Sequence, residues 1–263
     1  MKVFSLVFSL FALSQSVYSK PILSGSGQAN KDFYQIRVYH LKDDNQVSMT
    51  DNFLKNAYLP ALHRLGVKNI GVFKPLANDT ASDKCIYVLI PFSSSAQWLT
   101  ISDKINTDPA FNASARDFLA ADSKAAPFVR MESILLEAFP KQPHLVFPKQ
   151  KDAERIFELR SYESPTVHLA EKKMGMFNND EINIFNRLKF NPVFYGKVVS
   201  GSRMPNLMYM PVFKSVEDRN AGWKIFGSDP KWKEISTDPV NENNVSVNHI
   251  DSILMHSTSY SDY

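Results

Sequence analysis

The chain has 263 residues, of which 44% are hydrophobic, enough to build a packed core. Its 30 basic and 27 acidic residues are interspersed and leave a formal charge of only +3, which excludes the strongly basic surface typical of nucleic-acid-binding proteins. Cys85 is the single cysteine, which excludes an intrachain disulfide.

The first nineteen residues, MKVFSLVFSLFALSQSVYS, have the form of a secretory signal peptide. One lysine precedes an apolar run over 3–13, and Val17 and Ser19 stand where small residues precede a signal-peptidase cut. The run is too short to span a bilayer, and no later segment reaches about 20 uninterrupted apolar residues. We therefore predict cleavage near Ser19, a linker over 20–32, and a secreted or periplasmic protein without a membrane span. A buried N-terminal helix is the alternative.

The next elements follow the order strand, helix, strand, strand, helix, strand. Residues 33–40 alternate as a strand does, and the helical stretch MTDNFLKNAYLPALHRLG follows. In it, Asp51 is placed to cap the start and Gly66 to end the helix, and Pro60 must kink the helix or start a new turn. VKNIGVFKPL and CIYVLIPF are two strand candidates, SSSAQWLTISDKI begins a second helical region, and 129–139 reads as the closing strand.

The same plan recurs after about 120 residues, so the chain contains an internal repeat. DFYQIRVYHLK matches RIFELRSYESP, NIGVFKP matches NPVFYGK, NTDPAF matches GSDPKW, and MESILLEAF matches IDSILMHS. KQPHLVFPKQKDA, with two prolines, reads as the linker between the copies. We predict a first ferredoxin-like domain over 33–140, a linker over 141–153 and a second ferredoxin-like domain over 154–258.

This element order is that of a split βαβ sheet, in which both helices cover one face and the other face needs a partner. Two copies in one chain supply that partner. We therefore predict an α+β fold in which two ferredoxin-like units pack sheet to sheet as an intrachain α/β barrel, which also removes exposed strand edges. A monomer with pseudo-twofold symmetry and a higher homo-oligomer both remain open.

The repeated strand carries polar side chains at alternate positions in both copies. They are Gln35, Arg37 and Tyr39 in the first copy and Glu158, Arg160 and Tyr162 in the second. Because side chains two apart share a face, we expect the apolar alternates to pack under the helices and the polar set to face the space between the sheets.

Two interpretations of this polar set remain open. In one, arginine and glutamate form an internal ion pair, joined to Glu132 or Asp251 of the last strand, that only fixes the strand register. In the other, the set lines a ligand pocket in which an arginine meets an anionic or carbonyl group and a tyrosine supplies a hydroxyl.

Metal and cofactor signals are weak. There is no HExxH motif and no Cys/His cluster with ligand spacing, so we predict no metal site. Cys85 lies in a strand-like run and is expected to be a small buried hydrophobe. His63 and His249 are candidate haem ligands, with a solvated or hydrogen-bonded histidine as the simpler interpretation of each. No motif requires a cofactor, so the cofactor stays unknown.

FELRSYESP, MFNNDEINIFNRLKFNPVFYGKVVSGSRMPNLMYMPVF and SVEDRNAGWKIFGSDPKWKEI together resemble a NIPSNAP domain, in the exported tandem form found in bacteria. The first copy keeps YQIRVY, GVFKP and DPAF, but it has Gln35 where the motif prefers Glu and lacks a counterpart of Arg219. The resemblance implies a dimeric α/β-barrel fold. Its superfamily includes haem-degrading and quinone-forming monooxygenases, chlorite dismutases and muconolactone isomerases, but no settled reaction is implied for NIPSNAP domains.

Two functions therefore stay open, and so does the question of whether the protein is an enzyme. One is an exported binding or scaffold module whose barrel holds a small apolar or anionic molecule or is simply filled. The other is a small oxidase, monooxygenase or isomerase, cofactor-independent or haem-dependent, in which Glu158, Arg160 and Tyr162 polarise a carbonyl and move a proton. We favour the first because no nucleophile, metal cluster or phosphate cradle is evident.

Overall fold

The computed structural model describes residues 30–148, 152–238 and 243–263. The predicted signal peptide, most of the linker over 20–32 and part of the linker over 141–153 lie outside the described residues. Within the described part, no helix has both the length and the apolar character needed to cross a membrane.

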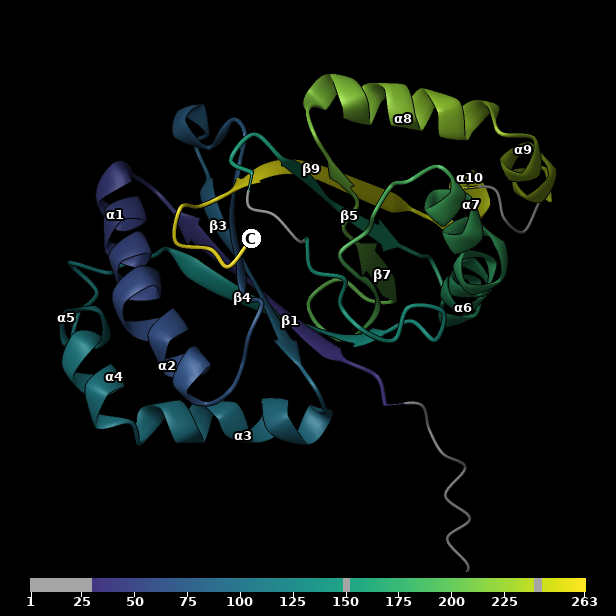
Figure 1. Cartoon of the computed structure of the whole chain (residues 1–263). Helices are drawn as coiled ribbons and strands as arrows, with labels where there is room; N and C mark the ends of the chain where they lie inside the picture. Colours follow the sequence, from purple (N-terminus) through teal and green to yellow (C-terminus); the bar gives the residue numbers. More distant parts are fainter. Residues whose placement is uncertain (1–29, 149–151, 239–242) are drawn as a thin grey trace, which may run out of the picture.

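The first half has the predicted element order (Figure 1). Its strands are β1 (Phe33–Leu41), β2 (Gly71–Pro75), β3 (Lys84–Phe92) and β4 (Arg130–Ala138). Its helical elements are α1 (Asp44–Phe53), the π-helical turn η1 (Leu54–Tyr58), α2 (Leu59–Arg64), the short 3-10 turn η2 (Asn78–Thr80), α3 (Ser95–Asn106), α4 (Pro109–Ser114) and α5 (Arg116–Leu119).

The second half repeats this order. Its strands are β5 (Ile156–Glu163), β6 (Tyr195–Ser200), β7 (Asn206–Tyr209), β8 (Val212–Phe213) and β9 (His249–Ser257). Its helical elements are α6 (Val167–Met176), the π-helical turn η3 (Phe177–Glu181), α7 (Ile182–Arg187), α8 (Val216–Ser228), α9 (Pro230–Ser236) and α10 (Asn243–Ser246). The short strands β7 and β8 both pair with β5 and together replace the single strand β3 of the first half.

The strands close into one antiparallel barrel. Their order is β7-β6-β4-β1-β3-β2-β9-β5, and β7 pairs with β5 to close the ring. The two seams between the halves are β2 with β9, where Lys74 lies opposite His256, and β4 with β6, where Leu136 lies opposite Val198. Figure 1 shows helices α1 to α5 on one side of the barrel and α6 to α10 on the other. The predicted α+β intrachain barrel is therefore confirmed, with the pseudo-twofold axis running along the barrel.

The first helix begins earlier than predicted. Its N-cap is Asp43, whose side chain accepts a hydrogen bond from the backbone N–H of Gln46 at 2.9 Å, so Asp51 lies inside the helix. Pro60 lies in the first turn of α2, where a proline costs least, so it starts a new turn, which is one of the two predicted outcomes. The second copy has a π-helical turn at the same place without a proline, so this turn belongs to the repeat.

The two faces of the repeated strand are the reverse of the prediction. The apolar side chains Tyr34 and Ile36 of β1 pack inside the barrel with Phe157 and Leu159 of β5. The polar alternates instead face the helices, and Tyr39 belongs to the core beneath the first-half helices. The physical reason is that the interior of an eight-stranded barrel is filled by side chains and offers few partners for charges, whereas the helices bring polar groups of their own.

One end of the barrel is filled by aromatic side chains. The ring of Tyr263 lies with its centroid 5.4 Å from that of Phe73, 5.7 Å from Phe157 and 4.7 Å from Phe147. The segment after β9 reaches this place by folding back along β2, with the N–H of Thr258 donating to the carbonyl of residue 72 at 2.9 Å.

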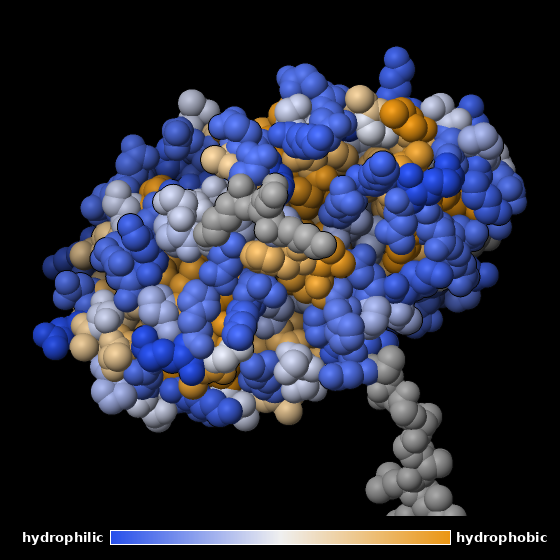
Figure 2. All heavy atoms as spheres, in the orientation of Figure 1, coloured by the Kyte–Doolittle hydropathy of each residue, from blue (hydrophilic) through white to orange (hydrophobic). Residues whose placement is uncertain are grey.

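Figure 2 shows mostly hydrophilic residues on the face in view, with hydrophobic residues visible mainly in hollows between them.

Candidate functional site

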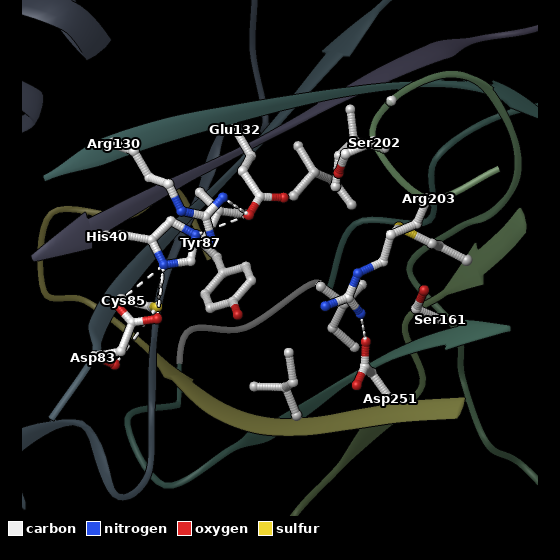
Figure 3. A pocket seen from close by; sticks show the side chains of 17 residues that line it. His40, Asp83, Cys85, Tyr87, Arg130, Glu132, Ser161, Ser202, Arg203 and Asp251 are labelled. Atoms are coloured by element: carbon white, nitrogen blue, oxygen red, sulfur yellow. Dashed lines mark hydrogen bonds and ion pairs between the residues drawn. The ribbon is translucent and has the colours of Figure 1, made fainter. Parts of the chain in front are cut away.

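The opposite mouth of the barrel opens into a cavity of about 280 Å³ (Figure 3). Strands β1, β3 and β4 of the first half and β5, β7 and β9 of the second supply its walls, together with the loop that carries Arg203. The two halves therefore enclose the cavity jointly, and neither half alone would form it.

The cavity changes from apolar to polar toward its mouth. Its floor is made of the side chains of Ile36, Val38, Ile134, Leu159, Met208 and Ile253. Along β1 the lining residues run from Ile36 through Val38 to His40, and along β4 from Ile134 through Glu132 to Arg130. A molecule bound here would therefore meet hydrocarbon at the bottom and charged groups at the rim.

Four side chains of the first half converge on His40 at the rim. His40 of β1 lies directly opposite Cys85 of β3, and its Nδ1 atom is 3.7 Å from Cys85 Sγ. The same Nδ1 is 2.8 Å from Oδ2 of Asp83, while Nε2 is 3.0 Å from Oε1 of Glu132. Arg130 donates to the same Glu132 oxygen from the solvent side. Figure 3 shows these groups together on one wall of the cavity.

The second half presents a related but more open arrangement. Asp251 occupies in β9 the place that Glu132 occupies in β4, since both strands flank the first strand of their repeat in the same register. Arg203 donates a hydrogen bond to Asp251, and His249 Nε2 lies 2.9 Å from Asp251 Oδ1. Figure 3 shows Arg203 and Asp251 across the cavity from His40.

Burial sets the protonation of the thiol and phenol in this wall. Burial, reinforced by the charge of Asp83, raises the pKa of Cys85 to about 11. Burial also raises the pKa of Tyr87 well above its usual range. The thiol is therefore protonated at neutral pH and would become a thiolate there only if a cation took the place of its proton.

The predicted residues of the second copy form a network between the sheet and α8, outside the cavity. Glu158 is fully buried and accepts a hydrogen bond from Arg160 Nη1 at 2.6 Å. Arg219 of α8 donates to both carboxylate oxygens, at 3.0 and 2.6 Å. Trp223 Nε1 donates at 2.7 Å and Ser252 Oγ at 2.6 Å. Glu158 is thus satisfied on every side by groups of the protein itself.

The remaining predicted residue of that copy continues the network. Arg160 donates to the hydroxyl of Tyr162 from Nε at 3.2 Å and from Nη2 at 2.9 Å. The Tyr162 and Tyr209 hydroxyls lie 3.0 Å apart. The guanidinium of Arg160 also stacks over the ring of Trp223, 4.5 Å from its centroid. These contacts hold Arg160 in a single orientation against the helices.

The first copy keeps a weaker form of the same arrangement. Gln35 donates to Ser133 Oγ at 2.7 Å and accepts from Arg37 Nε at 3.3 Å. Arg37 stacks over the ring of Tyr58, 4.7 Å from its centroid. Burial raises the pKa of Tyr39 above its usual range, and the neighbouring Arg37 opposes the shift.

The structure therefore contains the predicted ion pair but not its predicted partners. Arg160 and Glu158 are joined to α8, whereas Glu132 and Asp251 lie at the cavity rim with partners of their own. The six predicted residues do not line the described cavity, and a ligand-binding role for them stays a prediction.

A pair of buried ionisable side chains in the second half was not predicted from the sequence. Lys173 of α6 and Glu181 of η3 are 1% and 2% exposed. Burial raises the pKa of Glu181 and lowers that of Lys173, while their mutual attraction opposes both shifts. The first copy has Thr50 and Tyr58 at the corresponding helix positions, so the pair is specific to the second half.

The two candidate haem ligands lie apart from the cavity. His63 Nε2 is 3.1 Å from Asp262 Oδ2, and the side chain is 41% exposed. His249 contacts Asp251 and its side chain is 53% exposed. Neither histidine lines the cavity at the barrel mouth, so a haem bound in that cavity would not have either of them as a lining residue.

The cluster around His40 was not predicted from the sequence. Its members stand far apart in the chain, and the spacing of 43 residues between His40 and Asp83 matches no motif. The signal that could have found them is cross-strand register, because pairing β1 with β3 places His40 against Cys85. Cys85 is buried as predicted, but it touches an imidazole as well as the apolar core.

Several solved structures share this fold over nearly their whole length. A protein from Lactobacillus acidophilus NCFM, provisionally named a monooxygenase, has a TM-score of 0.55 and 12% identity, with 86% of this chain and 94% of that chain covered. A protein from Fusobacterium nucleatum subsp. nucleatum ATCC 25586, named in the same way, has a TM-score of 0.57 and 9% identity, with coverages of 87% and 93%. An anthrone oxidase-like protein has a TM-score of 0.53 and 6% identity, with coverages of 88% and 92%.

Identities this low establish the barrel fold alone. No curated protein matches the chain. The NIPSNAP family model matches residues 157–262, a range that runs from β5 through β9 and includes Glu158, Arg160 and Arg219. The similarity of this chain to the NIPSNAP family therefore extends over residues 157–262, in its second half.

Proposed function

We propose that the protein is an exported binding module that holds one small amphipathic molecule in the cavity at the barrel mouth. The observation that carries this proposal is the cavity itself, which both halves enclose and which runs from an apolar floor to a charged rim. Export rests on the signal-peptide pattern of residues 1–19. The proposed binding needs no partner chain, because the tandem copies already complete the barrel.

The volume of the cavity limits the size of the ligand. Small-molecule sites have volumes of about 300 to 1,000 Å³, so a cavity of about 280 Å³ lies just below that range. The apolar floor favours a hydrocarbon or aromatic body. The ligand is therefore a small molecule with one polar end, held with that end toward the rim.

The rim charges favour a neutral or singly cationic polar end. Three carboxylates, those of Asp83, Glu132 and Asp251, line the cavity with two guanidinium groups, those of Arg130 and Arg203. These five groups carry one excess negative charge, and both arginines are already paired with carboxylates. An anionic ligand would have to displace one of those ion pairs. The neutral or cationic ligand proposed for the cavity therefore differs from the anionic or carbonyl ligand that the sequence predicted beside Arg37 or Arg160.

Native mass spectrometry of the protein purified from its source cell tests this proposal. We expect a retained small molecule in the wild type and its loss in Ile253→Phe, because the larger side chain would fill the cavity floor. Val199→Phe is the matched control, since Val199 is exposed on β6 outside the barrel. Retention in Ile253→Phe, or no bound molecule and no binding from a library of small amphipathic compounds, would contradict the proposal.

A second candidate function is a small oxidase or monooxygenase acting on a molecule in the same cavity. The fold neighbours that are provisionally named monooxygenases support it at the level of the fold. Within this chain, Tyr87 and Cys85 place a phenol and a thiol at the cavity wall. Oxygen uptake with the retained molecule as substrate, lost in Ile253→Phe and kept in Val199→Phe, would favour this function over simple binding.

A further inference from the structure

We propose that His40, Asp83 and Cys85 bind one divalent cation of the zinc class at the rim of the cavity. The three residues offer an imidazole nitrogen, a carboxylate oxygen and a thiol sulfur, and these atoms all lie within 4.8 Å of one another. This inference does not depend on the proposed binding of an organic molecule, because all three protein ligands belong to the first half and water can take the fourth position.

The distances suit tetrahedral coordination. Bond lengths of about 2.3 Å to sulfur, 2.0 Å to nitrogen and 2.1 Å to oxygen place the ligand atoms of a tetrahedral zinc site about 3.4 to 3.6 Å apart. Cys85 Sγ and His40 Nδ1 are 3.7 Å apart. Nδ1 and the nearer Asp83 oxygen are 2.8 Å apart, so Asp83 must move outward slightly, which its 62% exposed side chain permits.

Glu132 prepares His40 to bind a cation through Nδ1. Glu132 Oε1 lies 3.0 Å from Nε2, so the ring can donate its Nε2 proton to this carboxylate and leave the Nδ1 lone pair free for a metal. A carboxylate behind a ligating histidine is the usual support of such ligands. Arg130 shares the same Glu132 oxygen, so its positive charge is directed at the carboxylate.

The chemistry of the three ligands selects the cation. A thiolate with an imidazole favours zinc and similar borderline-soft ions over magnesium and calcium, which prefer oxygen ligands. Cysteine binds a metal as the thiolate, so metal binding releases the thiol proton and should strengthen with rising pH. The three protein ligands leave a fourth position, as in zinc sites that bind water or substrate.

Cobalt(II) titration of the full mature chain, stripped of metal with a chelator, tests the inference. We expect one Co²⁺ per chain with a thiolate-to-cobalt charge-transfer band in the near ultraviolet, and displacement of Co²⁺ by Zn²⁺. Cys85→Ser should remove the band, and Asp83→Asn should weaken binding at least about 10-fold. Glu132→Gln should keep the band but weaken binding about 10- to 100-fold, as loss of a supporting carboxylate does.

His249→Gln is the matched control, because this histidine faces a carboxylate in the second half without a thiol nearby. It should leave cobalt binding unchanged, and circular dichroism of each variant should show a wild-type fold. A second measurement is alkylation of Cys85 by iodoacetamide, which Zn²⁺ should slow at least about 10-fold by occupying the thiolate. The absence of the charge-transfer band in the folded wild type, its persistence in Cys85→Ser, or alkylation unaffected by Zn²⁺ would overturn the inference. The last result would favour a free Cys85 thiol beside His40.

Discussion

Arg219 of α8 and Glu158 of β5 form an ion pair with two parallel hydrogen bonds, at 3.0 Å from Nε to Oε2 and 2.6 Å from Nη2 to Oε1. Glu158 is fully buried, so the pair connects α8 to the wall of the barrel. Counted from the N-caps Ser94 and Ser215, the first copy has Trp98 where the second has Arg219. The ionic connection between helix and sheet is therefore specific to the second half.

Removing the arginine of this pair should destabilise the fold. We expect Arg219→Met to lower the free energy of unfolding by about 3 kcal/mol, because it leaves a buried carboxylate with one charged partner instead of two. Urea denaturation measures the change. Arg116→Met, the same substitution at an exposed position on α5, should stay within about 0.5 kcal/mol of wild type. A loss below about 1 kcal/mol for Arg219→Met would show that Arg160 alone can hold Glu158.

Stability in acid should depend on Glu158. Burial alone would raise its pKa, but hydrogen bonds from Arg219 and Ser252 and the charge of Arg160 outweigh burial and lower the pKa from 4.5 to about 2. The charged carboxylate therefore stabilises the fold above pH 4.5, and this contribution is lost as the pH falls toward 2. We expect Glu158→Gln to reduce the loss in free energy of unfolding between about pH 4.5 and 2 by up to about 3 kcal/mol. Urea denaturation at a series of pH values measures this loss. An unchanged slope would contradict the lowered pKa.

Glu181 should give a slope of the opposite sign at higher pH. Burial raises its pKa from 4.5 to about 7, against the charges of Lys173 and Arg160. Between those values the folded state holds a proton that the unfolded state has released, so the free energy of unfolding falls as the pH rises from 4.5 to 7. Glu181→Gln should remove this decrease, whereas Glu171→Gln, at an exposed position on α6, controls for loss of a carboxylate. A decrease that persists in Glu181→Gln would assign it to another group.

Two glycine substitutions should have opposite effects. A Cβ at Gly196 of β6 would lie 2.9 Å from Cβ of Leu136 across the seam between the halves, so Gly196→Ala should destabilise by about 1 to 3 kcal/mol. A Cβ at Gly175 of α6 meets nothing within 4 Å, so Gly175→Ala should stabilise by up to about 1 kcal/mol through helix propensity. Thermal unfolding of both variants measures the difference. A neutral Gly196→Ala would mean that the seam can widen without loss of packing.

Much of the architecture could be predicted because it rests on local patterns. Hydrophobic periodicity identified the strands and helices, and the internal repeat identified two copies of one unit. Closure of two open sheets into one barrel then followed from the need to cover their bare faces. The NIPSNAP motifs lie in the half that the family model matches.

The orientation of the repeated strand could not be predicted in the same way. Alternation separates Arg160 and Glu158 from Phe157 and Leu159, but it does not say which set faces the helices. In a barrel wrapped by helices both faces are buried, so burial gives no preference. The choice depends on Arg219 and Trp223, which reach Glu158 only after α8 has packed on the sheet.

The sequence by itself determined the element order, the twofold repeat and the chemical nature of the strands, because these depend on residues that are neighbours in the chain. Only the tertiary structure decided where a cavity remains and which side chains meet there. His40, Asp83 and Cys85 come together through the register of β1 and β3, and Arg203 and Asp251 face them only because the second half closes the barrel. Such contacts are set by the pairing of distant segments, which local pattern does not encode.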